Sequence, residues 1–275
     1  MLKVTIADVL DFRGYMLDLG MAPKTILRRV SSLSSFYKYL AAAAAETRLP
    51  IVVPNPAHAQ FVPRGSADAR DETKALTATR ARQLMGMPAG DDLVSYRDRA
   101  ILKVYLYTGI RLTTGYRLKV PDFHQDGEAT LKLHEKGDKR RAIGLRFNAA
   151  QAIGEYVEKA GITSGPLFRA AAPRSRERLS SRPMDSATMY RVIQGYLRRL
   201  PGAMKKERIE DGSEVEYCVY TPHSLRATTV TLLLDAGVDI KKAQDLLGHR
   251  HITMKQIYDK RRITASQSAS HDVPI

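Results

Sequence analysis

The sequence predicts a mainly α-helical protein with one small antiparallel β-sheet. A short all-α N-terminal domain is expected to be joined by a proline-rich linker to a larger α+β domain. Apolar residues recur three and four positions apart over most of the chain, as on the buried face of a helix. One stretch, Thr130–His134, instead alternates apolar and polar residues, which is typical of a strand. Prolines at positions 50, 54, 56 and 63 interrupt the helical pattern.

Residues 1–49 are expected to form two helices. Thr5-Ile-Ala-Asp8 has the form of a capping box, and Gly20 can end the helix that it starts. A second helix begins near Pro23. The apolar stripes are Val9, Phe12, Met16 and Leu19 in the first helix, and Ile26, Val30, Leu33, Phe36, Tyr37 and Leu40 in the second. The other side of the second helix carries Lys24, Arg28 and Arg29, which indicate either a surface for a nucleic-acid backbone or a solvated charged face.

Residues 50–73 are expected to be an extended linker, because their prolines, Gly65 and Ser66 cannot sustain a helix. The second domain then spans 74–275. The helical spacing of apolar residues resumes after Thr77 and again over Leu93–Tyr107. Gly109 is expected to end this second helix. A hairpin follows over residues 130–145 with its turn at 136–139, and residues 151–160 are expected to be helical.

The remaining segments are basic or helical. Residues 165–208 hold eleven Lys and Arg against three Asp and Glu, which indicates either a DNA-facing surface or a mobile basic loop. Residues 207–216 are polar and are expected to form an exposed turn. Helices are expected to resume at Thr221 and to continue to about Arg262.

The charge of the chain limits its function. A net charge of +15 favours a polyanionic partner, either nucleic acid or an anionic membrane, over a merely soluble basic protein. Membrane attachment is disfavoured, because we find no apolar run of spanning length, signal peptide or lipidation motif. The single cysteine, Cys218, excludes an internal disulfide and favours a cytoplasmic location. The sequence lacks a GxxxxGK[ST] loop, so nucleotide hydrolysis is not expected.

The segment Thr221-Pro-His-Ser-Leu-Arg226 has residues suited to binding a phosphate. Thr221 can cap a helix, with Pro222 in its first position. His223 and Arg226 then lie three residues apart on one face, near the positive end of the helix. Taken alone, an ordinary surface pair explains these two residues better.

A second segment follows at Leu246-Leu-Gly-His249. Its glycine is expected to end a helix, with His249 just beyond, and Thr253 can start another helix that carries Tyr258 in its second turn. Taken singly, such a tyrosine is usually a core residue and such a histidine a loop residue. Binding of a metal by His249 and His251 is a further alternative that we disfavour.

Together these motifs resemble the tyrosine recombinase (phage integrase) family of site-specific DNA recombinases. The matching segments are Thr108-Gly-Ile-Arg111, Lys136-Gly137, His223-Ser-Leu-Arg226, Leu246-Leu-Gly-His249 and Tyr258, nine residues after His249. Further likeness lies in Leu234-Asp-Ala-Gly-Val-Asp239, in Ile252–Tyr258, and in Thr25–Arg29 leading to Phe36–Leu40.

The resemblance implies a role for each matching residue. Tyr258 would attack the scissile phosphate and form a 3′-phosphotyrosyl link, with His223 as base and Lys136 as acid. Arg111 and Arg226 would hold the non-bridging oxygens, and His249 would donate a further hydrogen bond. Residues 1–49 would hold DNA through Lys24, Arg28 and Arg29, and Lys139 would contact it from residues 74–275, the catalytic domain. No metal or other cofactor is expected.

The resemblance also implies partners: double-stranded DNA and other recombinase subunits, as a tetramer on paired sites and a monomer or dimer off DNA. Three departures from the family pattern stand out. Thr114 replaces the acidic residue usual three positions after the first arginine, Ala227 stands where histidine is frequent, and the N-terminal domain has two clear helices instead of four or more.

Other functions remain open from the sequence. A type IB topoisomerase would use similar residues to relax one duplex, although the basic N-terminal helices and the short spacing from His249 to Tyr258 favour a recombinase. A DNA-binding accessory protein with an inactive catalytic domain is a second alternative, which Thr114 supports. A metal-dependent phosphoesterase is a third.

Overall fold

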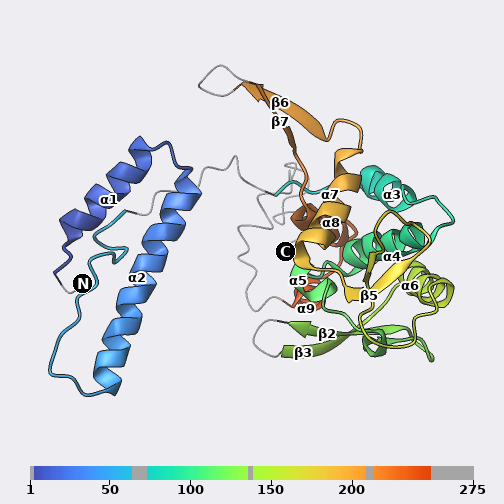
Figure 1. Cartoon of the computed structure of the whole chain (residues 1–275), viewed down its shortest axis with the longest axis horizontal. Helices are drawn as coiled ribbons and strands as arrows, with labels where there is room; N and C mark the ends of the chain where they lie inside the picture. Colours follow the sequence, from blue (N-terminus) through green and yellow to red (C-terminus); the bar gives the residue numbers. More distant parts are fainter. Residues whose placement is uncertain (1–2, 64–72, 136–138, 209–213, 249–275) are drawn as a thin grey trace, which may run out of the picture. The chain divides into compact units, whose positions relative to one another are not determined.

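The computed structural model describes residues 3–63, 73–135, 139–208 and 214–248. The chain divides into two compact units, Met1–Glu72 (unit 1) and Thr73–Ile275 (unit 2). Helices make up most of the regular structure of both units, and all strand pairs are antiparallel (Figure 1). The predicted fold class, mainly α with a small antiparallel sheet, is confirmed, although the described residues hold three small sheets where one was predicted.

Unit 1 consists of two packed helices and a following irregular segment. Helix α1 covers Ile6–Asp18 and α2 covers Pro23–Glu46 (Figure 1). The predicted capping box forms, since Thr5 Oγ1 accepts from the Asp8 N–H at 3.2 Å and the Asp8 carboxylate accepts from the Thr5 N–H at 2.7 Å. The core consists of Val9, Met16, Ile26, Val30, Ala57 and Val62.

The core of unit 1 is narrower than the apolar stripes predict. Phe12 is 40% exposed and Leu19 is 54% exposed, although both belong to the predicted stripe of α1. A single partner helix covers only one line of residues on α1, which explains why the flanking apolar side chains stay accessible. Residues 51–63 form no helix, as their prolines predict, but Ala57 and Val62 are fully buried in the core of unit 1.

Unit 2 is built around helix α4, Leu93–Thr108, whose residues 100–102 and Val104 are fully buried. Helix α4 packs against α3, α6 and α8 (Figure 1). The helices around it are α3 (Ala78–Gly86), α5 (Leu112–Gly115), α6 (Phe147–Lys159), α7 (Ser186–Arg198), α8 (Pro222–Asp235) and α9 (Ile240–Leu247). None of the helices in the described ranges has both the length and the apolar content that a membrane span needs.

The predicted hairpin forms the largest sheet of the described residues. Strands β1 (Phe123–His124), β2 (Thr130–Glu135) and β3 (Lys139–Gly144) follow one another in it. Leu131 and Leu133 are buried and Lys132 is exposed, so the apolar residues of the alternating pattern are the ones that the strand buries. The pairing ends at Glu135↔Lys139, and residues 136–138, where the turn is predicted, lie outside the described residues.

Two expectations for unit 2 need correction. Of the two alternatives for residues 165–208, the mobile loop is excluded, because these residues contain β4 (Arg169–Ala171), β5 (Leu179–Pro183), α7 and β6 (Met204–Arg208), and the DNA-facing surface stays a prediction. Residues 207–216 are not merely a turn, because β6 pairs with β7 (Glu214–Cys218). Almost every side chain of this second hairpin is exposed, so it lacks the alternation of apolar and polar residues that reveals a strand.

Candidate active site

The turn after α4 places Arg111. Gly109 ends α4 in the left-handed conformation, with φ of 59°. A Cβ atom there would lie 2.6 Å from Leu247 Cδ2, so a larger residue would displace this side chain as well as strain the backbone. Arg111 is the N-cap residue of α5, and its side chain is 40% exposed. The glycine-terminated helix predicted from the sequence therefore presents Arg111 at the surface of unit 2.

Arg226 ties three distant segments together from a buried position on α8. It is 5% exposed, and its Nη1 donates to the Gly109 carbonyl at 2.5 Å while Nη2 donates to the Leu247 carbonyl at 2.8 Å. Burial lowers the pKa of Arg226 to about 10, and the positive charge of Arg111 contributes to this shift. The guanidinium remains protonated at neutral pH, so Arg226 is a fixed cation beside Arg111.

A buried carboxylate, Glu135 at the end of β2, joins two further guanidinium groups. Its Oε1 is 3.1 Å from Arg111 Nη1, and its Oε2 is 3.1 Å from Arg141 Nε. The Glu135 side chain is 5% exposed and that of Arg141, on β3, is 20% exposed. We call Arg111, Arg141 and Arg226 the arginine cluster.

Arg141 also holds the C-terminal end of α9. Its Nη1 donates to the carbonyl of Asp245 at 3.0 Å and to that of Leu246 at 2.8 Å. The last carbonyls of a helix have no partner within it and carry partial negative charge, which explains their pairing with a cation. Gly248 then ends α9 with φ of 63°, as predicted, and the chain continues to His249.

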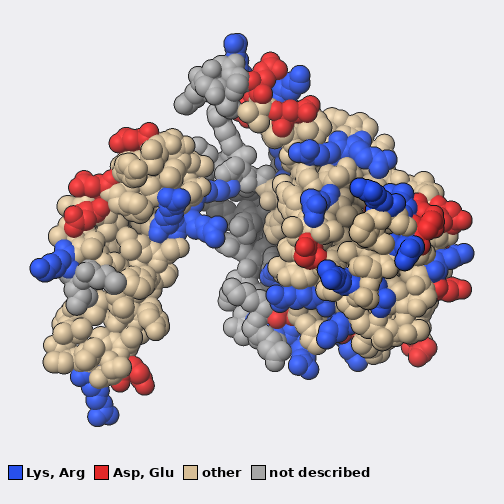
Figure 2. Space-filling view, viewed as in Figure 1, with Lys and Arg blue, Asp and Glu red and all other residues tan. Residues whose placement is uncertain are grey.

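The arginine cluster is suited to an anion. Among the ion pairs of the described residues, Glu135 is the carboxylate that contacts Arg111 and Arg141, and planar guanidinium groups match phosphate oxygens in pairs. Within the described ranges, no group of three His, Cys, Asp or Glu side chains could hold a metal ion. Figure 2 shows Lys and Arg side chains spread over the visible face of unit 2.

The other predicted site residues fall into two groups. His223 is exposed in the first turn of α8, which starts as predicted with Thr221 as N-cap and Pro222 in first position, and Lys139 is exposed at the start of β3. Lys136, His249 and Tyr258 lie outside the described residues.

The structure therefore brings Arg111 and Arg226 together and adds two residues that the sequence did not reveal, Glu135 and Arg141. A faint indication existed, since Glu135 is an acidic residue directly before Lys136 in a strongly basic hairpin.

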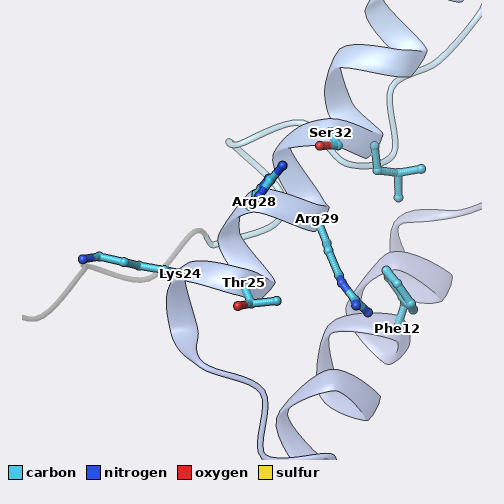
Figure 3. Close-up of a pocket in the computed structure, with 7 residues that line it drawn as sticks. Phe12, Lys24, Thr25, Arg28, Arg29 and Ser32 are labelled. Carbon is cyan, nitrogen blue, oxygen red and sulfur yellow. The ribbon is translucent and has the colours of Figure 1, made fainter. Parts of the chain in front are cut away.

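The predicted DNA-binding residues of unit 1 line one concavity. Lys24, Arg28 and Arg29 are exposed in the first turns of α2. They line a hollow of about 710 Å³. Arg29 reaches toward α1 beside Phe12, while Lys24 points away from α1 (Figure 3). Its lining contains three cations and no carboxylate, so this surface is also suited to an anion.

Comparison with known proteins identifies the family. Residues 74–263 match the model of the phage integrase family. The chain is 29% identical over 252 residues to a tyrosine recombinase XerD of Listeria innocua, which covers 91% of this chain and 76% of that protein. It is 30% identical over 264 residues to a tyrosine recombinase XerC of Chlorobaculum parvum, with 93% and 74% covered.

Solved structures share the fold. A XerH site-specific recombinase bound to its palindromic difH substrate matches with a TM-score of 0.66 and 18% identity, over 98% of this chain and 73% of that one. A lambda integrase dimer bound to a core site matches with a TM-score of 0.58 and 21% identity, over 92% of this chain and 81% of that one. The fold, the motifs and the family match agree, and the chain belongs to the phage integrase family of tyrosine recombinases.

Proposed function

We propose that this protein is a site-specific DNA recombinase that cleaves and rejoins DNA through a 3′-phosphotyrosyl intermediate at Tyr258, without metal or ATP. The family match supports the reaction class. The observation that carries the proposal is the arginine cluster, in which Arg111 and Arg226 are held together by bonds that cross from α8 to the end of α4 and to the end of α9. The chain leaves this point at Gly248 and enters the segment that contains His249 and Tyr258.

The proposed reaction exchanges one phosphodiester bond for another. A bond forms between Tyr258 Oη and the scissile phosphorus, and the bond from phosphorus to the 5′-oxygen breaks. The phenol has an ordinary pKa of ~10, so it needs a base, and we assign its proton to His223. Lys136 would give a proton to the leaving 5′-oxygen. Attack by another 5′-hydroxyl reverses these steps, so no energy source is needed.

The arginine cluster would stabilise the charge that develops on the phosphate. Arg111 is partly exposed and can reach the non-bridging oxygens. Arg226 is fixed by two backbone carbonyls, and fixed donors need little reorganisation during the reaction. His249 would donate a further hydrogen bond to the same oxygens.

We also propose that double-stranded DNA and other copies of the chain are the partners. The solved structures that share the fold include a lambda integrase dimer on a core site and a lambda integrase tetramer on a Holliday junction. In this chain, Lys24, Arg28 and Arg29 would contact the DNA backbone from unit 1, and Lys139 from unit 2. We expect a tetramer on paired sites and a monomer or dimer off DNA.

A covalent-capture experiment tests the proposed function. A pool of random-sequence duplexes is nicked a few nucleotides to the 3′ side of the randomised region, so that cleavage releases a short fragment and traps the enzyme. Protein–DNA adducts that survive denaturation are isolated, digested with protease and sequenced. We expect one recurring sequence to be captured, with chelator present and without ATP.

The outcomes separate the alternatives. Binding without any covalent adduct would show an accessory protein and contradict the proposal. Adducts with no sequence preference, together with relaxation of a supercoiled plasmid, would show a topoisomerase. Adduct formation that a chelator abolishes would show metal-dependent chemistry.

A further inference from the structure

The Glu135 carboxylate contacts two different arginines of the arginine cluster, one with each oxygen. A carboxylate that binds a single arginine through both oxygens would orient only that arginine. By dividing its oxygens between Arg111 and Arg141, Glu135 instead sets the separation of a residue before α5 and a residue on β3. Its effect is therefore on the relative position of two elements.

The burial of Glu135 makes this contact costly to lose. Its side chain is 5% exposed, and an ionised carboxylate is unfavourable in such a place unless it is paired. The backbone of Gly248 lies against the pair, because a Cβ atom there would be 2.5 Å from Glu135 Oε2 and 2.9 Å from Arg141 Nε. Glu135 has no room to turn toward another partner on that side.

Three candidate catalytic residues are neighbours of Glu135, in space or along the chain. Arg111 is in direct contact with it. Lys136 is the next residue in the chain, and His249 follows Gly248, whose backbone packs against the pair of Glu135 and Arg141. Of the three, only Arg111 belongs to the described residues, and a shift of this carboxylate would move its guanidinium directly.

Thr114, three residues after Arg111, carries no charge and is 3% exposed. Arg111 is the N-cap of α5, and Thr114 lies within that four-residue helix. Among the ion pairs of the described residues, the carboxylate that contacts Arg111 comes from β2 instead. The negative charge against Arg111 therefore comes from Glu135 and not from a residue of α5.

We propose that Glu135 is a positioning residue for strand cleavage, which holds Arg111 against the scissile phosphate. This inference rests on the proposed function. Its role is indirect, so removal of the charge should slow the chemical step and leave DNA binding nearly unchanged. A carboxylate introduced at position 114 should then recover part of the lost cleavage rate.

The test compares four forms of the full chain on one nicked duplex from the random pool. They are wild type, Glu135→Gln, Glu135→Gln with Thr114→Asp, and the control Glu128→Gln, which removes the same charge from an exposed position before β2. Single-turnover cleavage is measured over a range of protein concentrations, which separates the maximal rate from the half-saturating concentration. Thermal unfolding is followed for each form.

We expect Glu135→Gln to lower the maximal rate roughly 100-fold, as misplacement of a catalytic group by ~1 Å can do. Its half-saturating concentration should stay within about threefold of wild type, since most phosphate contacts remain. The double variant with Thr114→Asp should have a maximal rate about tenfold higher than that of Glu135→Gln. Glu128→Gln should match wild type in both quantities.

Three results would overturn the inference. One is a wild-type rate for Glu135→Gln, and another is a failure of that protein to fold, which would make Glu135 a structural residue. The third is a folded Glu135→Gln protein whose rate does not rise with Thr114→Asp. Failure of wild type to form any adduct would contradict the proposed function, so the two ideas fail in different measurements.

Discussion

Arg226 is held by geometry that only an arginine provides. Its two terminal nitrogens donate to carbonyls on different elements, Gly109 and Leu247, from a position that is 5% exposed. A lysine has one terminal nitrogen on an unforked stem and cannot span both carbonyls in the same way. The charge is conserved in Arg226→Lys, but the link between α4 and α9 is not.

We therefore expect Arg226→Lys to destabilise unit 2 by about 1–3 kcal/mol, the usual cost of leaving a buried carbonyl unpaired. Urea unfolding of wild type and variant measures this. Arg117→Lys, at an exposed position, is the control and should change stability by less than about 0.5 kcal/mol. Equal midpoints for Arg226→Lys and wild type would show that the two hydrogen bonds contribute nothing.

For single residues, the sequence predicted the positions of site residues that belong to motifs of fixed spacing. Arg111 follows a helix-ending glycine, and Arg226 lies one turn into a helix that begins with Thr221-Pro222, so both could be placed on elements. Glu135 and Arg141 could not be predicted, because their role arises from contacts with the end of α9, more than a hundred residues away in the chain. The catalytic roles of all the candidate residues stay predictions, namely those of Arg111, Lys136, His223, Arg226, His249 and Tyr258.

Among the elements, α4 has the clearest means of stabilising its start. Asp92 is its N-cap, and its carboxylate accepts from the Ser95 N–H at 2.9 Å, from the Ser95 hydroxyl at 2.8 Å and from Arg176 at 3.1 Å. Burial alone would raise the pKa of Asp92, but the bonds from Ser95 and Arg176 outweigh it and lower the pKa below its ordinary value of 3.8. The ionised form is thus favoured in the folded state.

Asp92→Ala should lower the free energy of unfolding by about 1 kcal/mol at pH 7, as loss of an N-cap usually does. A lowered pKa in the folded state means that this stabilisation is present above pH 3.8 and is lost as the pH falls through the folded-state pKa. Urea midpoints at pH 7 and near pH 3 measure it, with Asp126→Ala in an exposed loop as the control. A difference between Asp92→Ala and wild type that persists unchanged at the lower pH would contradict this account.

Elements with a defined start and end in the sequence were predicted well. The capping residues Thr5, Thr77 and Thr221 and the glycines 109 and 248 gave the ends of helices that the structure confirms. The β6–β7 hairpin was missed, since strands that bury nothing have no apolar period. The start of α6 at Phe147 was missed by four residues, because its N-cap, Arg146, makes no side-chain cap bond.

For the whole molecule, charge and the division into two units lead to one prediction. We expect binding to be strongly salt-dependent, because a protein that neutralises roughly 6–10 phosphates loses ~10³–10⁵ in affinity between about 50 and 200 mM salt. A fragment of residues 73–275 lacks Lys24, Arg28 and Arg29. It should bind more weakly, with a salt slope shallower by roughly 2 to 3 units, near 0.9 for each lost phosphate contact.

The matched comparison is a full-length chain with Lys24→Ala, Arg28→Ala and Arg29→Ala. Fragment and variant are titrated against one duplex at several salt concentrations. Similar losses in both would assign the effect to these three side chains. Affinity and slope equal to those of wild type in both would show that unit 1 does not hold DNA.

The central claim is that Tyr258 becomes covalently attached to DNA, and peptide mapping of the trapped adduct tests it most directly. Wild type and Tyr258→Phe are incubated with the same captured duplex, and the adduct is digested and sequenced by mass spectrometry. We predict a 3′-phosphate remnant on the peptide that contains Tyr258, and for Tyr258→Phe normal DNA binding without any adduct, because only the nucleophilic oxygen is lost. A remnant on any other residue, or an adduct formed by Tyr258→Phe, would contradict the account.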